Sequence, residues 1–479
     1  MTNAVVVGSG PNGLAAALTL AARGVHVRVL EAKDTIGGGT RSSEHTLPGL
    51  IHDDCSAFHP TGVASPFIQG LGLKEYGLNW LWPEIDLVHP LDGGRAGVLW
   101  RDIDRTVEQM GPDGKAWGRL FGRITGNFDA LTGDVFRPIV HIPDHPFKLA
   151  HFGLNALLPA TWSVHRWETE EVRALFGGVA AHAFGALNAP LSSSVGLMLV
   201  AAGHAHGWPV AEGGSRSITN AMTRKLEKLG GIIETGVEVT SVRDLGDADI
   251  VMLDVAPDAA LRIMGDRLPK RVKRAYKKFR YGPGVYKVDF AIEGDVPWTN
   301  EHARRAGTVH LGGTFEQVVE AEGQVARGMM PKQPFILVGQ QYLADPSRSV
   351  GDMFPIWAYA HVPHGYAGDA TEAIVEQIER FAPGFRRQIR HTFVRNVSDL
   401  ESYNANYVGG DISAGANNGL QIAMRPRIAL NPYKTGVPGV YLCSSATPPG
   451  AGVHGMCGFN AATSALNDLG ITPEETQTL

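Results

Sequence analysis

The chain has 479 residues, a formal net charge of −5 at pH 7 and a hydrophobic content of 44%. This length exceeds what one compact core usually accommodates, so we expect two or more domains. The acidic balance argues against nucleic acid as a partner, because phosphate binding requires a basic surface. Three cysteines, Cys55, Cys443 and Cys457, form no C-x-x-C pattern, which predicts a cytoplasmic protein without disulfides or a structural metal site.

The first 31 residues carry a βαβ signature. Residues 5–7 predict a buried strand, "LAAALTLAA" predicts a helix that stops at Gly24, and "HVRVLE" predicts a second strand that ends in Glu31. A G-x-G-x-x-G motif lies between the first strand and the helix. The alternative interpretation is a glycine-rich turn in an ordinary α/β protein.

Each glycine of this motif has a separate role in dinucleotide binding. Gly8 permits a tight turn, Gly10 lets a pyrophosphate approach the backbone, and Gly13 lets the helix pack on the strand. The free N–H groups of the helix N-terminus attract phosphate, and Glu31 is placed to accept a hydrogen bond from a ribose 2′-hydroxyl. We therefore predict a cofactor loop composed of Gly8, Ser9, Gly10, Pro11, Asn12 and Gly13.

A second glycine cluster follows at residues 37–39, with Arg41 two positions later. Glu31 disfavours a 2′-phosphate, so NADP is not expected. An NAD site has no evident use for a second loop of close approach, whereas a longer cofactor that lies across the sheet does. The cluster therefore favours FAD.

Two segments in the middle of the chain allow two interpretations each. The apolar, proline-bounded segment 141–162 lines a substrate entrance or forms the core of a helical cap, and we favour core. The basic segment 261–280 rests on an anionic membrane or is an ordinary solvated helix whose Val272, Tyr276 and Phe279 face the core, and we favour the second. His204 and His206 have no third ligand nearby, so we expect no metal there.

The later segments predict a second domain. Residues 284–292, 335–343 and 356–362 alternate and are rich in β-branched and aromatic residues, which predicts strands of one antiparallel sheet. Residues 370–384 predict a helix that ends at Pro383-Gly384.

Several stretches, in order, resemble one superfamily. The acid, short spacer and Gly-Gly pattern of residues 31–39 is similar to that of FAD enzymes such as amine oxidases and phytoene desaturases. "GWPVAEGGSRSITNAMTRKLEKLGGIIETGVEVTSV" (207–242), "DADIVMLDVAP" (247–257) and "GVYLCSSATPPGAGVHGMCGFNAA" (439–462) resemble later motifs of the same group. The chain most resembles phytoene-desaturase-like FAD oxidoreductases, in the branch of pyridine nucleotide-disulphide oxidoreductase domain-containing protein 2, through "HDDCSAFHPTGVASPF" (52–67), "GTVHLGG" (307–313) and "WAYAHVPHG" (357–365).

The resemblance implies an α/β fold in which a discontinuous Rossmann-type FAD-binding domain joins a substrate domain of mixed or antiparallel sheet with a helical cap. We assign residues 1–86, 205–260 and 396–479 to the first domain, and 87–204 and 261–395 to the second. The resemblance also implies that the backbone near Val239 meets the adenine of the cofactor, and that a helix N-terminus lies under the flavin pyrimidine. The further cofactor residues implied are Gly38, Gly39, Arg41, Ser445, Gly452, Val453, His454 and Met456.

The flavin of such an enzyme accepts the hydride itself, so an acid or base is optional. His59 follows the second glycine loop, while Tyr359 and His361 share one face of a predicted strand; these three are the catalytic candidates.

The predicted activity is FAD-dependent dehydrogenation or desaturation of an apolar or amphipathic small molecule, with hydride transfer to flavin N5. A flavin-dependent isomerase without net redox change, and a flavin- or lipid-binding protein without turnover, are the alternatives. The sequence makes no prediction of the oligomeric state.

Overall fold

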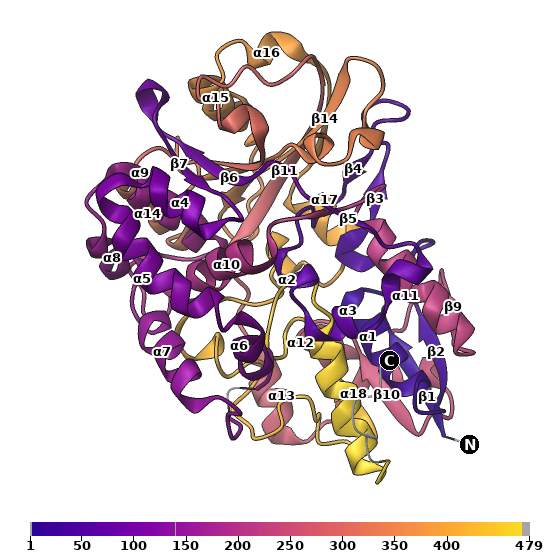
Figure 1. Ribbon diagram of the computed structural model, residues 1–479. Helices are drawn as coiled ribbons and strands as arrows, with labels where there is room; N and C mark the ends of the chain where they lie inside the picture. Colours follow the sequence, from indigo (N-terminus) through magenta and orange to yellow (C-terminus); the bar gives the residue numbers. More distant parts are fainter. Residues whose placement is uncertain (1, 139, 472–479) are drawn as a thin grey trace.

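Two β-sheets organise the computed structural model, which describes residues 2–138 and 140–471 (Figure 1). The smaller sheet is parallel throughout, and its strand order is β16 (Val440–Leu442), β10 (Ile250–Leu253), β1 (Asn3–Val7), β2 (His26–Leu30) and β9 (Ile232–Glu234). Residues 4–7 of β1 and all of β10 are apolar and buried because helices cover both faces of the sheet.

Three helices that are remote in sequence pack together on one face of this sheet: α1 (Pro11–Ala21), α11 (Arg216–Lys228) and α18 (Met456–Asp468). Helices α12 (Pro257–Met264) and α13 (Lys270–Lys277) cover the other face. Val272, Tyr276 and Phe279 of the basic segment are all buried, which confirms that its apolar stripe faces the core.

The larger sheet has the strand order β15 (Ile389–Arg395), β11 (Gly284–Glu293), β14 (Met353–Val362), β13 (Ile336–Gly339), β12 (Ala306–Leu311), β6 (Ile85–Pro90) and β7 (Ala96–Leu99). All neighbouring strands are antiparallel except β12 and β6. The predicted strands and their antiparallel sheet are confirmed, as is the predicted helix, which is α15 (Thr371–Phe381).

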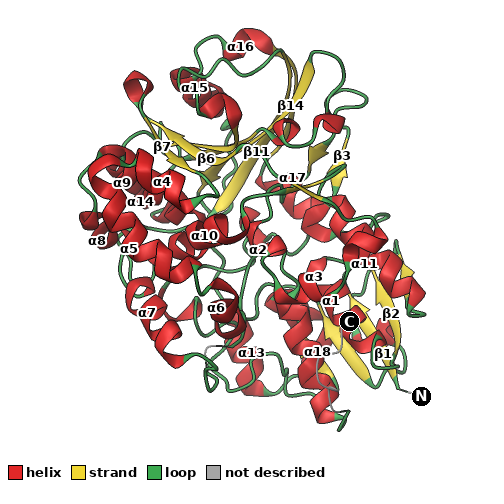
Figure 2. Ribbon diagram, in the orientation of Figure 1, coloured by secondary structure: helices red, strands yellow, loops and turns green. Residues whose placement is uncertain are grey.

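The remaining elements cover the large sheet or connect the two sheets, and Figure 2 shows α5, α6 and α7 grouped beside it. The helices are α2 (Pro60–Val63), α3 (Pro66–Gly70), α4 (Ile103–Gln109), α5 (Gly114–Thr125), α6 (Phe128–Val135), α7 (Pro146–Ala156), α8 (Ala160–Ser163), α9 (Glu170–Ala180), α10 (Ser193–His206), α14 (Phe315–Ala326), α16 (Phe385–Gln388) and α17 (Val397–Tyr403). Two short strand pairs are β3 (Ser42–Ser43) with β4 (His52–Asp53) and β5 (Trp80–Leu81) with β8 (Val210–Ala211).

The predicted fold class is thus confirmed. The strands of the small sheet all fall within the segments assigned to the FAD-binding domain, whereas α13 packs on that domain from within a segment assigned to the other. The exact domain boundaries stay a prediction. No helix among the described residues is long and apolar enough to cross a membrane.

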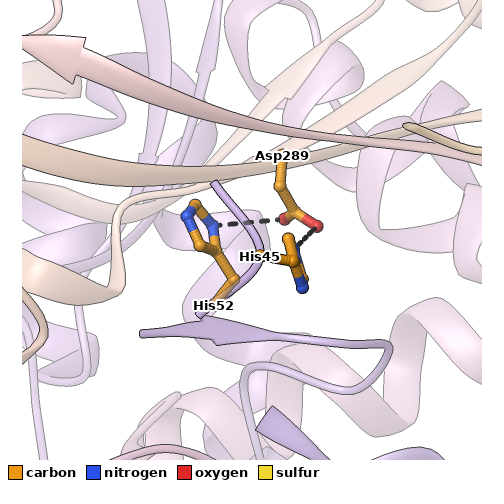
Figure 3. Close-up of side chains that lie close together, drawn as sticks. All are labelled: His45, His52 and Asp289. Atoms are coloured by element: carbon orange, nitrogen blue, oxygen red, sulfur yellow. Dashed lines mark hydrogen bonds and ion pairs between the residues drawn. The ribbon is translucent and has the colours of Figure 1, made fainter. Parts of the chain in front are cut away.

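A cluster of charged and imidazole groups joins the β3–β4 hairpin to the large sheet (Figure 3). His45 Nε2, from the loop between β3 and β4, lies 2.8 Å from Asp289 Oδ2 on β11, and His52 Nδ1 lies 3.5 Å from Asp289 Oδ1. Lys287 of the same strand forms an ion pair with Asp289. Burial alone would raise the pKa of Asp289, but the Lys287 ammonium and the hydrogen bond with His45 hold it well below its usual range.

The ligand atoms of His45, His52 and Asp289 lie within 4.8 Å of one another, a spacing that a metal ion also requires. The charges nevertheless balance without an ion. Lys287 neutralises Asp289, and Arg395 Nη2 lies 3.3 Å from Oδ1 of the neighbouring Asp54. We therefore interpret the cluster as an ionic contact between the domains.

The substitution Asp289→Asn tests this contact. It leaves the buried Lys287 ammonium without its counter-charge, so we expect the free energy of unfolding to fall by about 3–5 kcal/mol. Glu293→Gln, on the same strand, removes an exposed ion pair with Arg390 and should cost less than about 1 kcal/mol. Chemical unfolding followed by tryptophan fluorescence measures both; equal stability of the two variants would contradict the interpretation.

Candidate cofactor and substrate cavity

One cavity of about 980 Å³ extends from the C-terminal edge of the small sheet to the helical cap. Loops after β1, β2, β10 and β16 form one end of it. Helices α6, α7 and α10 and strand β14 form the other end. The position agrees with the rule that ligands of open α/β sheets bind beyond the carboxyl ends of the strands.

The glycines of the first motif have distinct environments. Gly8 has φ +102° and carries the chain from β1 into the turn, and Gly10 lines the cavity. A Cβ at Gly13 would lie 2.1 Å from the carbonyl oxygen of Gly8, so Gly13 permits α1 to pack on the end of β1. Gly13 itself does not line the cavity.

Glu31 organises the polar end of the cavity. Its Oε2 accepts hydrogen bonds from the backbone N–H of Ser9 at 3.0 Å and from Ser9 Oγ at 2.6 Å. Its Oε1 accepts one from the N–H of Lys33 at 3.0 Å and lies 3.2 Å from Arg41 Nη2. Arg41 also donates to the carbonyl oxygens of Thr35 and Gly38, so it fixes the second glycine loop around Glu31.

Gly39 makes room for a neighbouring side chain as well as for the approach of a cofactor. A Cβ at this position would lie 2.2 Å from Oη of Tyr407, which is also part of the cavity wall. The second glycine loop therefore makes room for a tyrosine.

The glycine-rich bend before α18 combines two functions. Gly452 has φ +139° and lines the cavity together with Val453 and His454. Gly458 instead lies at a helix crossing, because a Cβ there would be 1.8 Å from the carbonyl oxygen of Asn12 in α1. Glycine thus serves backbone access at one end of the bend and helix packing at the other.

Met456 lies apart from the implied cofactor contacts. It does not line the cavity, and its backbone N–H donates to His454 Nδ1 at 3.0 Å. The first N–H of α18 is therefore occupied by a side chain of the protein. His454 is buried, and burial lowers the pKa of its ring to about 4.

The cavity fits a dinucleotide of the predicted kind. Its wall includes, from the predicted set, Gly8, Ser9, Gly10, Pro11, Asn12, Glu31, Gly38, Gly39, Arg41, Val239, Ser445, Gly452, Val453 and His454. Asn12 Nδ2 donates to Ser445 Oγ at 3.1 Å, which joins the first loop to the flavin-end bend. The buried Asn12 Oδ1 has no hydrogen-bond partner among the described residues and is free for a ligand donor.

Sequence reasoning missed Asp254 at the end of β10. Its Oδ2 accepts the N–H of Gly13 at 2.9 Å and lies close to Gly8 and Gly10, in the position where a phosphate would be attracted. Burial and the nearby charge of Glu31 raise the pKa of Asp254 to about 7, although the Gly13 N–H opposes the shift. An acid directly after a buried strand, in "IVMLD", is the signal that could have identified it.

The cap end of the cavity is mostly apolar, although Asp134, Arg137 and His141 also line it near the end of α6. Its wall includes Phe136, Leu149, Phe152, Leu157, Leu191, Val195, Met198 and Leu199. Among the described residues, the three non-glycine positions with positive φ, Phe184, Leu191 and Ala414, all line the cavity. Backbone strain of this kind clusters at functional sites.

The three catalytic candidates lie in different places. Tyr359 lines the cavity, with its ring 4.9 Å from that of Trp357 and stacked on Phe184, and burial raises the pKa of its phenol. His361 lies behind Phe184, where its Nδ1 is 2.9 Å from Glu322 Oε1. His59 does not line the cavity, and its Nε2 is 2.8 Å from Ser215 Oγ. The structure therefore brings only Tyr359 to the cavity wall.

The sequence also gave no sign that His182 would reach this wall. Its Nε2 lies 3.1 Å from His310 Nε2. Burial, followed by the nearby His361, lowers the pKa of His182 to about 3, so the ring is neutral at physiological pH.

Asp254→Asn tests the state of the acid at the first loop. Because folding raises the pKa of Asp254 to about 7, the free energy of unfolding should fall as pH rises from about 4 to 7. The neutral amide removes this dependence. The free energy of unfolding of the variant should therefore exceed that of the parent protein by up to about 4 kcal/mol at pH 8 and differ little from it at pH 4. Thermal unfolding across this pH range provides the measurement. Asp249→Asn, at the exposed start of the same strand, is the control and should keep the parent's pH profile; an unchanged profile for Asp254→Asn would show that the acid is already ionised when folded.

Comparison with known proteins agrees with this geometry. Residues 6–69 match the model of the NAD(P)-binding Rossmann-like domain. Pyridine nucleotide-disulfide oxidoreductase domain-containing protein 2 of Rattus norvegicus is 24% identical, over 98% of this chain and 94% of the relative. The resemblance found in the sequence is thereby confirmed.

Two solved structures show the same fold. An oxidoreductase from Methanosarcina mazei has a TM-score of 0.64 at 15% identity, with 97% of this chain and 100% of the other covered. Cyclohexylamine oxidase from Brevibacterium oxydans has a TM-score of 0.58 at 18% identity, with 98% and 99% covered. The chain thus has the two-domain fold of these oxidoreductases over nearly its whole length, with a dinucleotide-binding Rossmann-like domain at its start, and this agrees with the predicted oxidoreductase with FAD as cofactor.

Proposed function

We propose that the protein is an FAD-dependent oxidoreductase that dehydrogenates an apolar or amphipathic organic substrate. The observation that carries this proposal is the continuity of one cavity between two chemically different ends. One end has the glycine loops and the acid that a dinucleotide needs, and the other is lined by aliphatic and aromatic side chains.

The polar end holds the cofactor. Gly8 to Asn12 present backbone to the pyrophosphate, and Glu31 accepts from the ribose. To accept from the ribose, the Glu31 carboxylate gives up the hydrogen bond that it receives from Ser9 Oγ in the structure. FAD supplies an acceptor for the hydride that leaves a substrate C–H bond.

The apolar end orients the substrate and excludes water. Tyr359, the catalytic candidate on the cavity wall, and the neighbouring Trp357 and Phe184 offer flat aromatic faces to a hydrocarbon chain or ring. Beside this aromatic face, Tyr359 and His182 are both neutral at physiological pH. Asp134 and Arg137 also line the cavity near the end of α6, but the Asp134 carboxylate accepts two backbone N–H groups and Arg137 pairs with Asp144. An aromatic face without an unpaired charge favours an uncharged substrate, since burying an unpaired ion costs several kcal/mol.

Absorption spectroscopy and anaerobic reduction test the proposal. The purified protein should show flavin absorption bands, and an apolar substrate should bleach them without oxygen, with one oxidised product formed per flavin reduced. Product formation without flavin reduction would support the isomerase. A bound flavin that no donor reduces would support the binding protein, and a protein that neither contains nor takes up FAD would refute the proposal.

Val195 allows a paired test of the substrate class. Its side chain lies on α10 at the apolar end, away from the glycine loops. Val195→Asp places a charge in the substrate region and should slow flavin reduction by an uncharged substrate at least about tenfold, since desolvation of that charge opposes binding. Val195→Thr, of nearly the same size, should slow it only a few-fold.

Both variants should keep the parent's flavin content, which shows that the cofactor end is intact. Rapid-mixing kinetics under anaerobic conditions give the rate of flavin reduction. If cationic amines reduced the flavin of Val195→Asp faster than uncharged substrates did, the new carboxylate would have changed the substrate preference. That result would support an uncharged substrate for the parent protein. Equal rates for all three proteins would place the substrate elsewhere.

A further inference from the structure

Helix α7 has apolar side chains on two opposite sides. Leu149, Phe152 and Ala156 face the cavity, whereas Phe147 is 89% exposed and Leu154 is 71% exposed. Positions 147 and 154 are seven residues apart and share one face of the helix. The helix therefore separates the cavity from the exterior and is apolar toward both. The interpretation of segment 141–162 as core is wrong for this outer face.

Further exposed apolar side chains extend this outer face. Ile142, just before α7, is 91% exposed, and Trp162, on α8 just after it, is 65% exposed. Pro138, Val140, Arg427 and Ala429 line one small depression, so the loop 428–430 adjoins the same surface. We call the resulting area the cap patch; its members are Val140, Ile142, Phe147, Leu154, Leu157, Trp162, Ile428 and Leu430.

The cavity reaches the exterior within the cap patch. Leu157 is 58% exposed and also lines the cavity, and Arg137, exposed beside the patch, lines it too. Several large apolar side chains exposed in neighbouring segments mark an interaction site. Here that site surrounds a route to the proposed substrate.

Positive charge lies next to the cap patch. Arg427, in the loop that adjoins the patch, has a pKa lowered by burial and, to a smaller extent, by the nearby charge of Arg271 on α13. From Lys270 to Arg280, "KRVKRAYKKFR" contains seven lysines and arginines and no acid, although the whole chain has a net charge of −5. Because the apolar stripe of α13 is buried, its basic side chains face outward. Figure 1 shows α7 at the lower left of the molecule and α13 near its bottom centre.

We propose that the cap patch and the basic residues of α13 dock on the surface of an anionic phospholipid bilayer, from which an apolar substrate enters the cavity. The substrate route rests on the proposed function, whereas the docking does not. Exposed Ile, Phe, Leu and Trp side chains enter the acyl boundary, while lysines and arginines pair with the headgroups. A second copy of the chain fits less well, because a two-fold contact through this patch would bring the two basic helices toward each other.

Cosedimentation of the full-length protein with lipid vesicles tests the docking. The wild-type protein should bind vesicles of phosphatidylcholine mixed with phosphatidylglycerol at least about tenfold more tightly than vesicles of phosphatidylcholine alone, and added salt should weaken the binding. The double variant Phe147→Ser/Leu154→Ser should lose at least about tenfold in affinity for the mixed vesicles.

The control is Met329→Ser/Val350→Ser, which removes two side chains that are about half exposed elsewhere, 48% and 51% respectively. This variant should bind as the wild type does. Lys277→Gln/Lys278→Gln should weaken binding to the mixed vesicles only. Unchanged vesicle affinity of the Phe147→Ser/Leu154→Ser protein would overturn the proposal, and so would a wild-type dimer in light scattering that this variant converts to monomer.

The docking and the catalytic proposal can fail separately. Phe147 and Leu154 do not line the cavity, so their double variant should be reduced at the parent's rate by a water-soluble substrate in the absence of vesicles. Vesicle binding without flavin reduction would support docking and refute the oxidoreductase. Flavin reduction without vesicle binding would support the oxidoreductase and refute the docking.

Discussion

The close approach of three backbone segments around the N-terminus of α1 is the constraint on which the cavity depends. The end of β1, the first turn of α1 and the first turn of α18 meet so closely that only glycine fits at Gly13 and Gly458, where a Cβ would lie 2.1 Å and 1.8 Å from carbonyl oxygens. Larger residues would separate the two helices. Because the loop before α1 and the bend before α18 form adjoining parts of the cavity wall, that separation would open the cofactor end.

The same crowding explains the charge state of Asp254. Its carboxylate occupies the site at the helix N-terminus that a phosphate would otherwise share, and it is held there by the Gly13 N–H. Burial, followed by the nearby charge of Glu31, raises the pKa of Asp254 to about 7. Asp254 therefore carries less negative charge at physiological pH than an exposed acid would, and the region is more acceptable to an anionic pyrophosphate.

The other wall of the cavity depends on contacts between the β3–β4 hairpin and the domain of the large sheet. Arg348, fully buried, lies 2.5 Å from Asp53 of β4 and 3.0 Å from Asp345, and the Asp289 cluster joins the adjacent loop to β11. These contacts fix the segment that carries Cys55 and Phe58 into the cavity wall. Buried charges at a domain contact add little net stability, but removal of one partner is costly, so such a contact tolerates few alternative geometries.

Local patterns predicted the fold and the cofactor loops well, for a physical reason. A βαβ unit, a glycine turn and an alternating strand are each specified by residues that are neighbours in the chain, as in residues 4–31. Tyr407 and His182 were missed because their positions depend on which distant segments pack against them, whereas Asp254 directly follows a buried strand and had a local signal. His59 was selected because it follows the second glycine loop, and His361 because it shares a face of a predicted strand with Tyr359, yet their rings are directed to Ser215 and Glu322.

Helix α7 shows where sequence patterns fail most instructively. An apolar segment such as 141–162 predicts burial, because apolar side chains usually avoid water. The pattern cannot distinguish a helix buried in protein from one whose outer side contacts lipid, since both environments select the same residues. Phe147 and Leu154 are exposed in the folded chain, so this side of the helix is not buried within the protein, and their exposure supports the proposed contact with lipid. A helix that is apolar toward both the cavity and the exterior is then the expected boundary between a hydrophobic reservoir and a hydrophobic site.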